Sequence, residues 1–189
     1  MAINRLNVSL SGVQPGGLAK VVPTSVAVGS GSGSVDSNGT VTFSGVSSVS
    51  INGVFNSTYD NYFIQIDFTH GSTQDASIKL RKSGTDKSTN YTMTGTRLNG
   101  TTVDNYGTGT TSFFYTMQVT NNNIGFTNLH IARPAISGRT TLMADSVGEV
   151  AGQRYITSGI QTETETYDGF TFICGTATTG KIKVYGYAN

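Results

Sequence analysis

Apolar and polar side chains alternate residue by residue in four stretches of this chain. On one face the pattern gathers Tyr62, Ile64, Ile66, Phe68, Ala76, Ile78, Leu80, Phe113, Tyr115, Met117, Val119, Ile182 and Val184. The residues between them, among them Ser77, Lys79 and Arg81, are expected to point outward. A period of two indicates strands of antiparallel sheets with one buried face. No window of a dozen residues shows the three-to-four-residue spacing of an amphipathic helix.

Turn signals separate these stretches at short intervals. Most pair a small polar residue with glycine: Asn38-Gly39, Asn52-Gly53, Asn99-Gly100, Ser137-Gly138, Asp168-Gly169 and Thr179-Gly180. Many short strands joined by such turns are typical of sandwiches and jelly rolls. We therefore expect residues 46–189 to form an all-β body, an antiparallel β-sandwich that is jelly-roll-like.

The first 45 residues differ from the rest. Residues 1–10 read as one strand, and the composition of residues 29–35, GSGSGSV, is that of a flexible linker. We predict that residues 1–45 form an extended N-terminal arm with a Gly/Ser linker, which adds a strand to a partner's sheet. The side chains expected to bind that partner are Ile3, Leu6, Val8, Leu10, Val21 and Val22. The alternative is that residues 1–45 supply one or two ordinary edge strands of the body.

Charge is sparse and balanced. Only 12% of the 189 residues are charged, and twelve basic against eleven acidic residues give a net charge of +1. Without a basic run, the chain lacks the signature of a nucleic-acid or anionic-membrane binder. No signal peptide is indicated, and no apolar stretch approaches the ~20 residues that cross a bilayer. We expect a protein made in the cytoplasm that neither inserts into membranes nor binds nucleic acid.

Reactive side chains do not cluster. Cys174 stands alone in the apolar run FTFIC, which predicts a buried thiol. His70 is expected at the exposed end of a strand, and His130 on the face opposite its apolar neighbours. Glu163 and Glu165 share a strand face, where solvated carboxylates are the simpler interpretation and a glycosidase pair is the alternative. We predict no catalytic residue, no cofactor and no metal site.

Two segments echo each other. YDNYFIQIDF at 59–68 and YDGFTFICGTATTGKIKVYGY at 167–187 both open with an aromatic–Asp–small–aromatic turn. Exposed tyrosines near turns could stack on sugar rings or form interface hot spots. We favour a structural role, in which each Asp accepts backbone N–H bonds and the rings cover the end of the sandwich.

A family resemblance rests on these motifs. The pattern VFNSTYDNYFIQID, then IKLRKSGT, YDGFTFI and a closing TGKIKVYGY resembles the β-sandwich modules of tailed-bacteriophage virion proteins, cyanophage proteins among them. Such modules occur as capsid decoration (cement) proteins and as tail-fibre or appendage proteins. The resemblance covers residues 46–189 and implies a jelly-roll-like homotrimer without catalytic residues.

The resemblance implies a virion structural protein, and the absence of a long shaft favours a place on the capsid. We expect a non-enzymatic cement protein that binds the outside of the capsid shell through its arm, with the major capsid protein or another virion protein as partner. The alternative is a tail fibre or appendage protein that recognises a host-surface receptor or glycan. A carbohydrate-active enzyme is the alternative of another class.

Overall fold

The computed structural model describes residues 17–71, 73–119, 124–148 and 152–187, and they confirm the predicted all-β, sandwich-like fold. All pairings between their strands are antiparallel. The strands are β1 (Leu18–Val21), β2 (Ser25–Val28), β3 (Ser32–Val35), β4 (Val41–Asn52), β5 (Asn61–Thr69), β6 (Gln74–Lys82), β7 (Thr85–Asp86), β8 (Tyr91–Asn99), β9 (Thr102–Thr111), β10 (Phe114–Val119), β11 (Ile124–Ala132), β12 (Gly138–Gly148), β13 (Arg154–Glu165) and β14 (Gly169–Tyr187).

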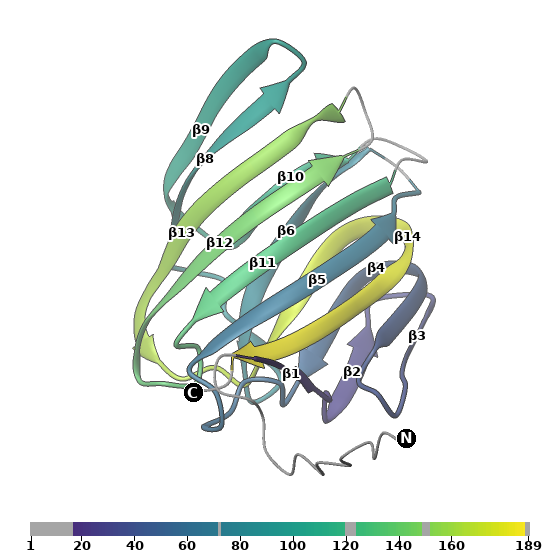
Figure 1. Cartoon of the computed structure of the whole chain (residues 1–189), viewed down its shortest axis with the longest axis vertical. Helices are drawn as coiled ribbons and strands as arrows, with labels where there is room; N and C mark the ends of the chain where they lie inside the picture. The colour runs from purple at the N-terminus through teal and green to yellow at the C-terminus, as the bar shows by residue number, and fades with distance from the viewer. Residues whose placement is uncertain (1–16, 72, 120–123, 149–151, 188–189) are drawn as a thin grey trace, which may run out of the picture.

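The strands form one sheet that curls into two layers (Figure 1). Its main path runs β10-β6-β14-β5-β11-β12-β13-β8-β9, and β4 pairs with β14 beside this path. Because the sheet curls, β10 at one end of the path packs near β12, β13 and β8 close to the other end. The two ends therefore approach each other without pairing.

Strand β14 belongs to both layers. Its first part, Gly169–Ile173, pairs with β6, whereas Thr179–Gly186 pairs with β5. Strand β4 pairs with both parts. Between these parts the backbone turns through two residues with positive φ, Gly175 at 78° and Ala177 at 55°. Such irregularities bend a strand and increase its twist. The expected turn at Thr179-Gly180 is wrong, because both residues lie inside β14.

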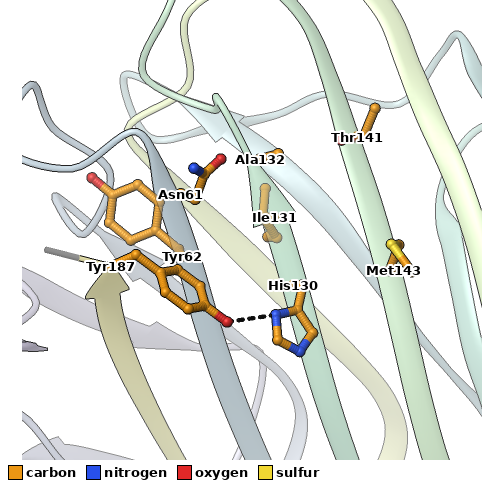
Figure 2. Close-up of a pocket in the computed structure, with 8 residues that line it drawn as sticks. All are labelled: Asn61, Tyr62, His130, Ile131, Ala132, Thr141, Met143 and Tyr187. Atoms are coloured by element: carbon orange, nitrogen blue, oxygen red, sulfur yellow. Dashed lines mark hydrogen bonds between the residues drawn. The ribbon is translucent and has the colours of Figure 1, made fainter. Parts of the chain in front are cut away.

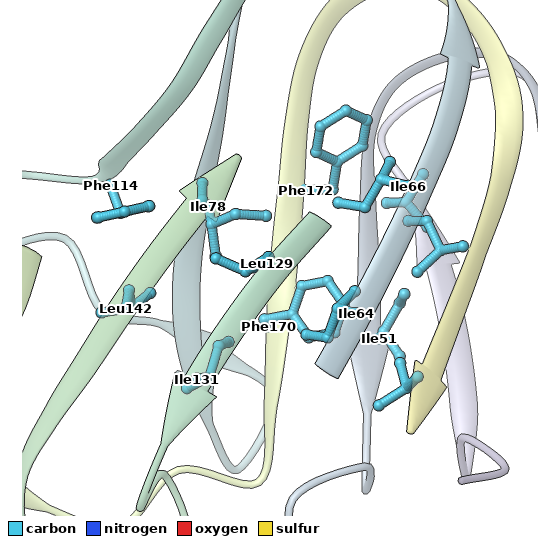
Figure 3. Packing of buried hydrophobic residues seen from close by; sticks show 14 of the residues in the cluster. Ile51, Ile64, Ile66, Ile78, Phe114, Leu129, Ile131, Leu142, Phe170 and Phe172 are labelled. Atoms are coloured by element: carbon cyan, nitrogen blue, oxygen red, sulfur yellow. The ribbon is translucent and has the colours of Figure 1, made fainter. Parts of the chain in front are cut away.

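The core lies between the layers (Figure 3). One layer contributes side chains from β5, β11, β12 and the second part of β14, and the other contributes side chains from β6, β10 and the first part of β14. Strand β4 adds side chains beside both parts of β14. Labelled in the figure are Ile51, Ile64, Ile66, Ile78, Phe114, Leu129, Ile131, Leu142, Phe170 and Phe172, each at most 1% exposed. The predicted inward faces of residues 62–68, 76–80 and 182–184 are confirmed by their burial.

The outward-facing side chains of β6 are partly covered by a neighbouring segment. Ser77 and Arg81 point away from the core, as predicted, yet they are 5% and 9% exposed. The short strand β7 pairs with the end of β6 and brings Asp86 opposite Arg81, where the two side chains form an ion pair. Burial of Arg81 was not expected from the alternation, because the covering segment follows it in sequence and carries no apolar pattern of its own.

The predicted alternation at 113–119 is wrong at its start. Phe114 rather than Phe113 is fully buried, and Thr116 and Met117 are both buried. A register shift between Tyr115 and Met117 in the pairing of β10 with β6 inserts one extra residue. A bulge of this kind moves the following side chains to the opposite face, which period-two patterns cannot indicate.

Residues 17–45 join the sheet. They form β1, which pairs with β14, then β2 and β3, which pair with β4, and the start of β4 itself. Residues 45 and 46 both lie inside β4, so the expected boundary falls within a strand. The Gly/Ser tract is largely strand β3 rather than a linker: a Cβ on Gly33 would stand 2.6 Å from a Val28 methyl, so glycine permits this close packing. The alternative of one or two edge strands comes nearer to what residues 17–45 form, namely three short strands, β1, β2 and β3, and the start of β4, which is paired on both sides.

Candidate functional site

The two echoing turns are structural. Asp168 O accepts hydrogen bonds from the backbone N–H groups of Val54 (2.9 Å) and Phe55 (3.1 Å), and its carboxylate Oδ2 accepts one from Ser83 N–H (2.8 Å). In the other turn it is the main-chain oxygen of Asp60 that accepts, from Arg133 N–H at 2.7 Å, so the expected bond to the carboxylate is shown for Asp168 and not for Asp60. The ring of Tyr167 is 2% exposed. These turns fasten loops at one end of the sandwich, beside a hollow of about 270 Å³ that Asn56, Ser83 and Asp168 help to line.

The carboxylates considered for hydrolysis are ion-paired. Glu163 contacts Lys87 Nζ and accepts a hydrogen bond from the Asn90 amide at 2.5 Å, while Glu165 lies 3.6 Å from the same ammonium. The hydrogen bond from Lys87 holds the pKa of Glu163 below its usual value. A glycosidase general acid needs a raised pKa, so the arrangement does not favour that chemistry.

His70 and Cys174 both contact the Thr178 hydroxyl, which lies 3.5 Å from His70 Nδ1 and donates to the main-chain oxygen of Cys174 at 3.0 Å. His70 is fully buried, so its expected exposed position is wrong; its ring packs edge-on against Phe68. His130 is exposed on the outer surface of β11, as expected, and Cys174 is buried, also as expected. In the described part of the chain no three potential ligands of the His, Cys, Asp or Glu type come together as a metal site would require. The same residues include no helix of the length and apolarity that a bilayer crossing needs.

Of the residues predicted to bind a partner, four precede the described part of the chain: Ile3, Leu6, Val8 and Leu10. Val21 pairs with Val184 and is 7% exposed, so it belongs to the core and is not available to a partner. Val22 is 51% exposed.

The outer surface of the larger layer carries a group of aromatic and apolar side chains. We call Phe63, His130, Met143, Tyr185 and Tyr187 the outer aromatic face. Cross-strand register places Tyr185 opposite Phe63, Phe63 opposite His130 and His130 opposite Met143, which makes one row across β14, β5, β11 and β12.

The rings in this row touch. The centroids of Phe63 and His130 are 4.9 Å apart, and those of Phe63 and Tyr185 are 6.1 Å apart. Tyr187 lies beside the row, with its hydroxyl 2.8 Å from His130 Nδ1 (Figure 2). Next to this bond lies a shallow hollow of about 410 Å³, and Met143 at its rim is 61% exposed. An apolar patch of this kind is typical of a surface that another protein covers.

A second site lies where the two ends of the curled sheet approach. We call it the seam cleft; its volume is about 480 Å³, within the ~300–1,000 Å³ typical of ligand sites. The backbone N–H of Tyr115, on β10, points to the Met93 sulfur on β8 at 3.2 Å, so β8 covers the edge of β10. The walls are β6 and β10 on one side and β8, β9 and β13 on the other.

Three tyrosines from three strands meet in the seam cleft. The ring centroids of Tyr106 and Tyr115 are 5.4 Å apart, those of Tyr115 and Tyr155 are 6.0 Å apart, and those of Tyr106 and Tyr155 are 6.4 Å apart. Tyr155 is buried, whereas Tyr106 and Tyr115 are half-buried. Burial raises the pKa of Tyr106 and of Tyr115, which keeps both phenols protonated as hydrogen-bond donors.

A glycine sets the position of Tyr106. Gly95 on β8 is its cross-strand partner, and a Cβ at Gly95 would stand 2.5 Å from the Tyr106 ring. The ring therefore lies across β8, and its hydroxyl bonds to Thr157 on β13. Aromatic side chains that cover a strand glycine in this way also stabilise the pairing.

Polar pairs border the cleft on both walls. On one wall Arg97 donates two hydrogen bonds to Asp104 Oδ2, from Nε at 3.1 Å and from Nη2 at 2.6 Å. On the other wall Gln118 Nε2 donates to Asp75 Oδ1 at 3.1 Å. The charged lining residues are thus one cation and two anions.

Neither site was singled out by the sequence pattern. The outer aromatic face draws on four strands whose register is set by tertiary pairing, and the seam cleft joins strands at opposite ends of the sheet path. The sequence of β8 does contain one signal for the seam cleft. Its inward positions are apolar at Tyr91 and Met93 but are occupied by Gly95 and Arg97 further along, whereas a strand that lies wholly in the core would stay apolar.

No known protein family matches this chain, and a search of curated proteins finds none similar to it.

Proposed function

We propose that this chain is a non-enzymatic structural protein of a bacteriophage virion, which decorates the outside of the capsid as a homotrimer. The observation that carries the proposal is the outer aromatic face, in which Phe63, His130, Met143 and Tyr185 form a row. The next outward row across the same strands is polar and consists of Gln65, Asn128, Asp145 and Lys183. Exposed apolar patches rimmed by polar residues are surfaces for protein partners. The resemblance of residues 46–189 to phage virion modules supports the same proposal.

The segment that precedes β1 remains the predicted capsid anchor. Leu18 pairs with Tyr187 and is 49% exposed, so strand β1 begins beside the outer aromatic face. The outer aromatic face would join the three subunits, and the anchor segment of each subunit would contact the capsid. Three copies in a trimer would repeat each weak contact, and the effective concentration would raise the overall affinity.

The trimer is tested by placing a charge in the face. Met143→Asp introduces a carboxylate at a 61% exposed position, so the monomer should fold as the wild type does. The matched control is Ser34→Asp, on the exposed strand β3. In sedimentation experiments the wild type and the control should run as trimers and Met143→Asp as a smaller species. A wild-type monomer at tens of micromolar, or a trimer unaffected by Met143→Asp, would rule out this interface.

The place in the virion is tested on purified particles. A decoration protein should be present in hundreds of copies over the capsid surface, and deletion of residues 1–16 should abolish capsid binding while the trimer persists. Deletion of all of residues 1–45 would not separate the two roles, because residues 17–45 belong to the sheet. A few dozen copies at the tail would instead support the alternative of a tail appendage protein. The observation that favours this alternative is the seam cleft, which could bind a receptor. Absence from particles would exclude both.

A further inference from the structure

We infer that the seam cleft is a binding site for a neutral saccharide. The inference goes beyond the proposed role in the virion and uses different residues, since the cleft shares none with the outer aromatic face. It does not depend on whether the protein sits on the capsid or on the tail.

The aromatic content of the cleft fits a sugar ring. Tyr106 and Tyr115 keep part of their rings exposed in a cavity of about 480 Å³. A pyranose presents one face of C–H bonds, which packs on an aromatic ring, and an edge of hydroxyls, which needs hydrogen-bond partners. Tyrosine provides both an apolar body and a polar tip.

The polar groups of the cleft suit hydroxyl pairs. Arg97, Asp104, Asp75 and Gln118 end in planar groups with two donor or acceptor atoms, and such groups bind neighbouring hydroxyls in a bidentate manner. They sit on both walls, two on β8 and β9 and two on β6 and β10, with the tyrosines between them. A ring held against Tyr115 would therefore find partners on either side.

The charge of the cleft selects against anionic ligands. One arginine faces two aspartates, and Asp104 occupies two of the arginine donors. A phosphate or sulfate group would meet a net negative lining and an arginine that is already paired. Nucleotides, nucleic acid and sulfated glycans are thus disfavoured, and neutral hexoses or N-acetylhexosamines remain.

The cleft is pre-formed. Gly95 allows the Tyr106 ring to lie on β8, and the hydroxyl bond to Thr157 fixes its direction. The Arg97–Asp104 pair likewise holds its guanidinium in place before any ligand arrives. Groups that are ordered in advance lose less entropy on binding.

The test applies the full-length protein to an array of neutral, sialylated and sulfated oligosaccharides. The best neutral oligosaccharide is then titrated while tyrosine fluorescence is followed, since the chain has nine tyrosines and no tryptophan. We expect neutral oligosaccharides to be retained in preference to sulfated ones. Tyr115→Ala should weaken binding about tenfold or more, as for other central aromatic contacts. Tyr115→Phe, which keeps the ring, should retain most of the affinity.

Two further variants separate loss of saccharide binding from misfolding and from loss of the trimer. Asp75→Ala tests for misfolding, and Tyr185→Ala tests for an effect of assembly. Asp75 is exposed, so its loss leaves the core intact and should still weaken binding several-fold. Tyr185→Ala removes a tyrosine from the outer aromatic face and should leave saccharide binding unchanged. The inference is wrong if no neutral oligosaccharide is retained, if sulfated ones bind better, or if folded Asp75→Ala and Tyr115→Ala bind like the wild type. Failure of Met143→Asp to disrupt the trimer would affect only the proposed function.

Discussion

Arg81 forms a buried ion pair, so its substitution would measure how much burial adds to the contribution of an ion pair to the unfolding free energy. Its guanidinium donates to Asn52 Oδ1 (3.0 Å), Ser50 Oγ (3.0 Å) and Thr171 Oγ1 (2.8 Å), and it pairs with the carboxylate of Asp86. Thr171 Oγ1 also donates to that carboxylate at 2.6 Å. The group therefore joins β4, β14 and β6 on the side away from the core, under the strand β7.

Arg81→Ala should cost about 3 kcal/mol of unfolding free energy. Removal of one partner from a buried pair costs ~3–5 kcal/mol, because the other charge stays buried without compensation. The Arg81 side chain is 11% exposed and that of Asp86 is 29% exposed, so water partly solvates the remaining carboxylate and the lower end applies. With an m-value of about 2 kcal/mol/M in urea, the midpoint should fall by about 1.5 M.

The assay is urea unfolding followed by circular dichroism, with the surface pair Arg154–Asp145 as the matched control. That pair makes two hydrogen bonds of 2.8 and 2.6 Å, but its side chains are 48% and 46% exposed. Arg154→Ala should not shift the midpoint measurably, because exposed pairs contribute little. The double variant Arg81→Ala/Asp86→Ala should lose less than the sum of the single variants. Equal midpoints for Arg81→Ala and Arg154→Ala would refute the role of burial.

Three further predictions concern the core, the pH dependence and the thiol. Phe172→Ala should destabilise the protein by ~3–5 kcal/mol, because Phe172 is fully buried, and Phe172→Leu should cost clearly less; calorimetry measures both, and a small loss for the alanine variant would contradict the packing. Lys87 lowers the pKa of Glu163, so the stability from this pair is complete above the usual value of 4.5 and is lost as the pH falls below it. Glu163→Gln should therefore flatten the acid limb of the stability–pH curve, and an unchanged limb would oppose the assignment. Burial raises the pKa of Cys174 to about 11, so a thiol reagent at pH 8 should react only after unfolding, and rapid labelling in buffer would show that the thiol is accessible.

The fold class could be predicted because local pattern and tertiary burial agree along most strands. In β5 the alternation places Tyr62, Ile64 and Ile66 inside, and all three are fully buried. The local pattern and the observed burial disagree where a neighbouring strand determines whether a residue is buried. Arg81 is buried by β7, and Gly33 lies in a strand because it pairs with Phe43 of β4, although glycine does not favour strands.

The candidate sites could not be predicted from the local alternation of apolar and polar residues, because they too depend on contacts between distant strands. A bulge at Tyr115–Met117 changes the faces of β10, and one extra residue cannot be located from periodicity alone. The seam cleft further requires that β8 meet β10, two strands that are far apart along the sheet. His70 shows the same limit, since a histidine that ends a strand was expected in solvent and is enclosed instead.

The sharing of β14 between both layers has a consequence for synthesis of the protein. Strands β1, β4, β5 and β6 are complete by residue 82, yet each pairs with a part of residues 169–187. At roughly 5–20 residues per second, translation of the 105 residues between (187 − 82) takes about 5–20 s. During that time the nascent chain carries apolar strands with open edges, which invite aggregation on polysomes. Slower initiation or a holding chaperone should raise the yield, whereas a chain cut before residue 169 should be recovered as insoluble material.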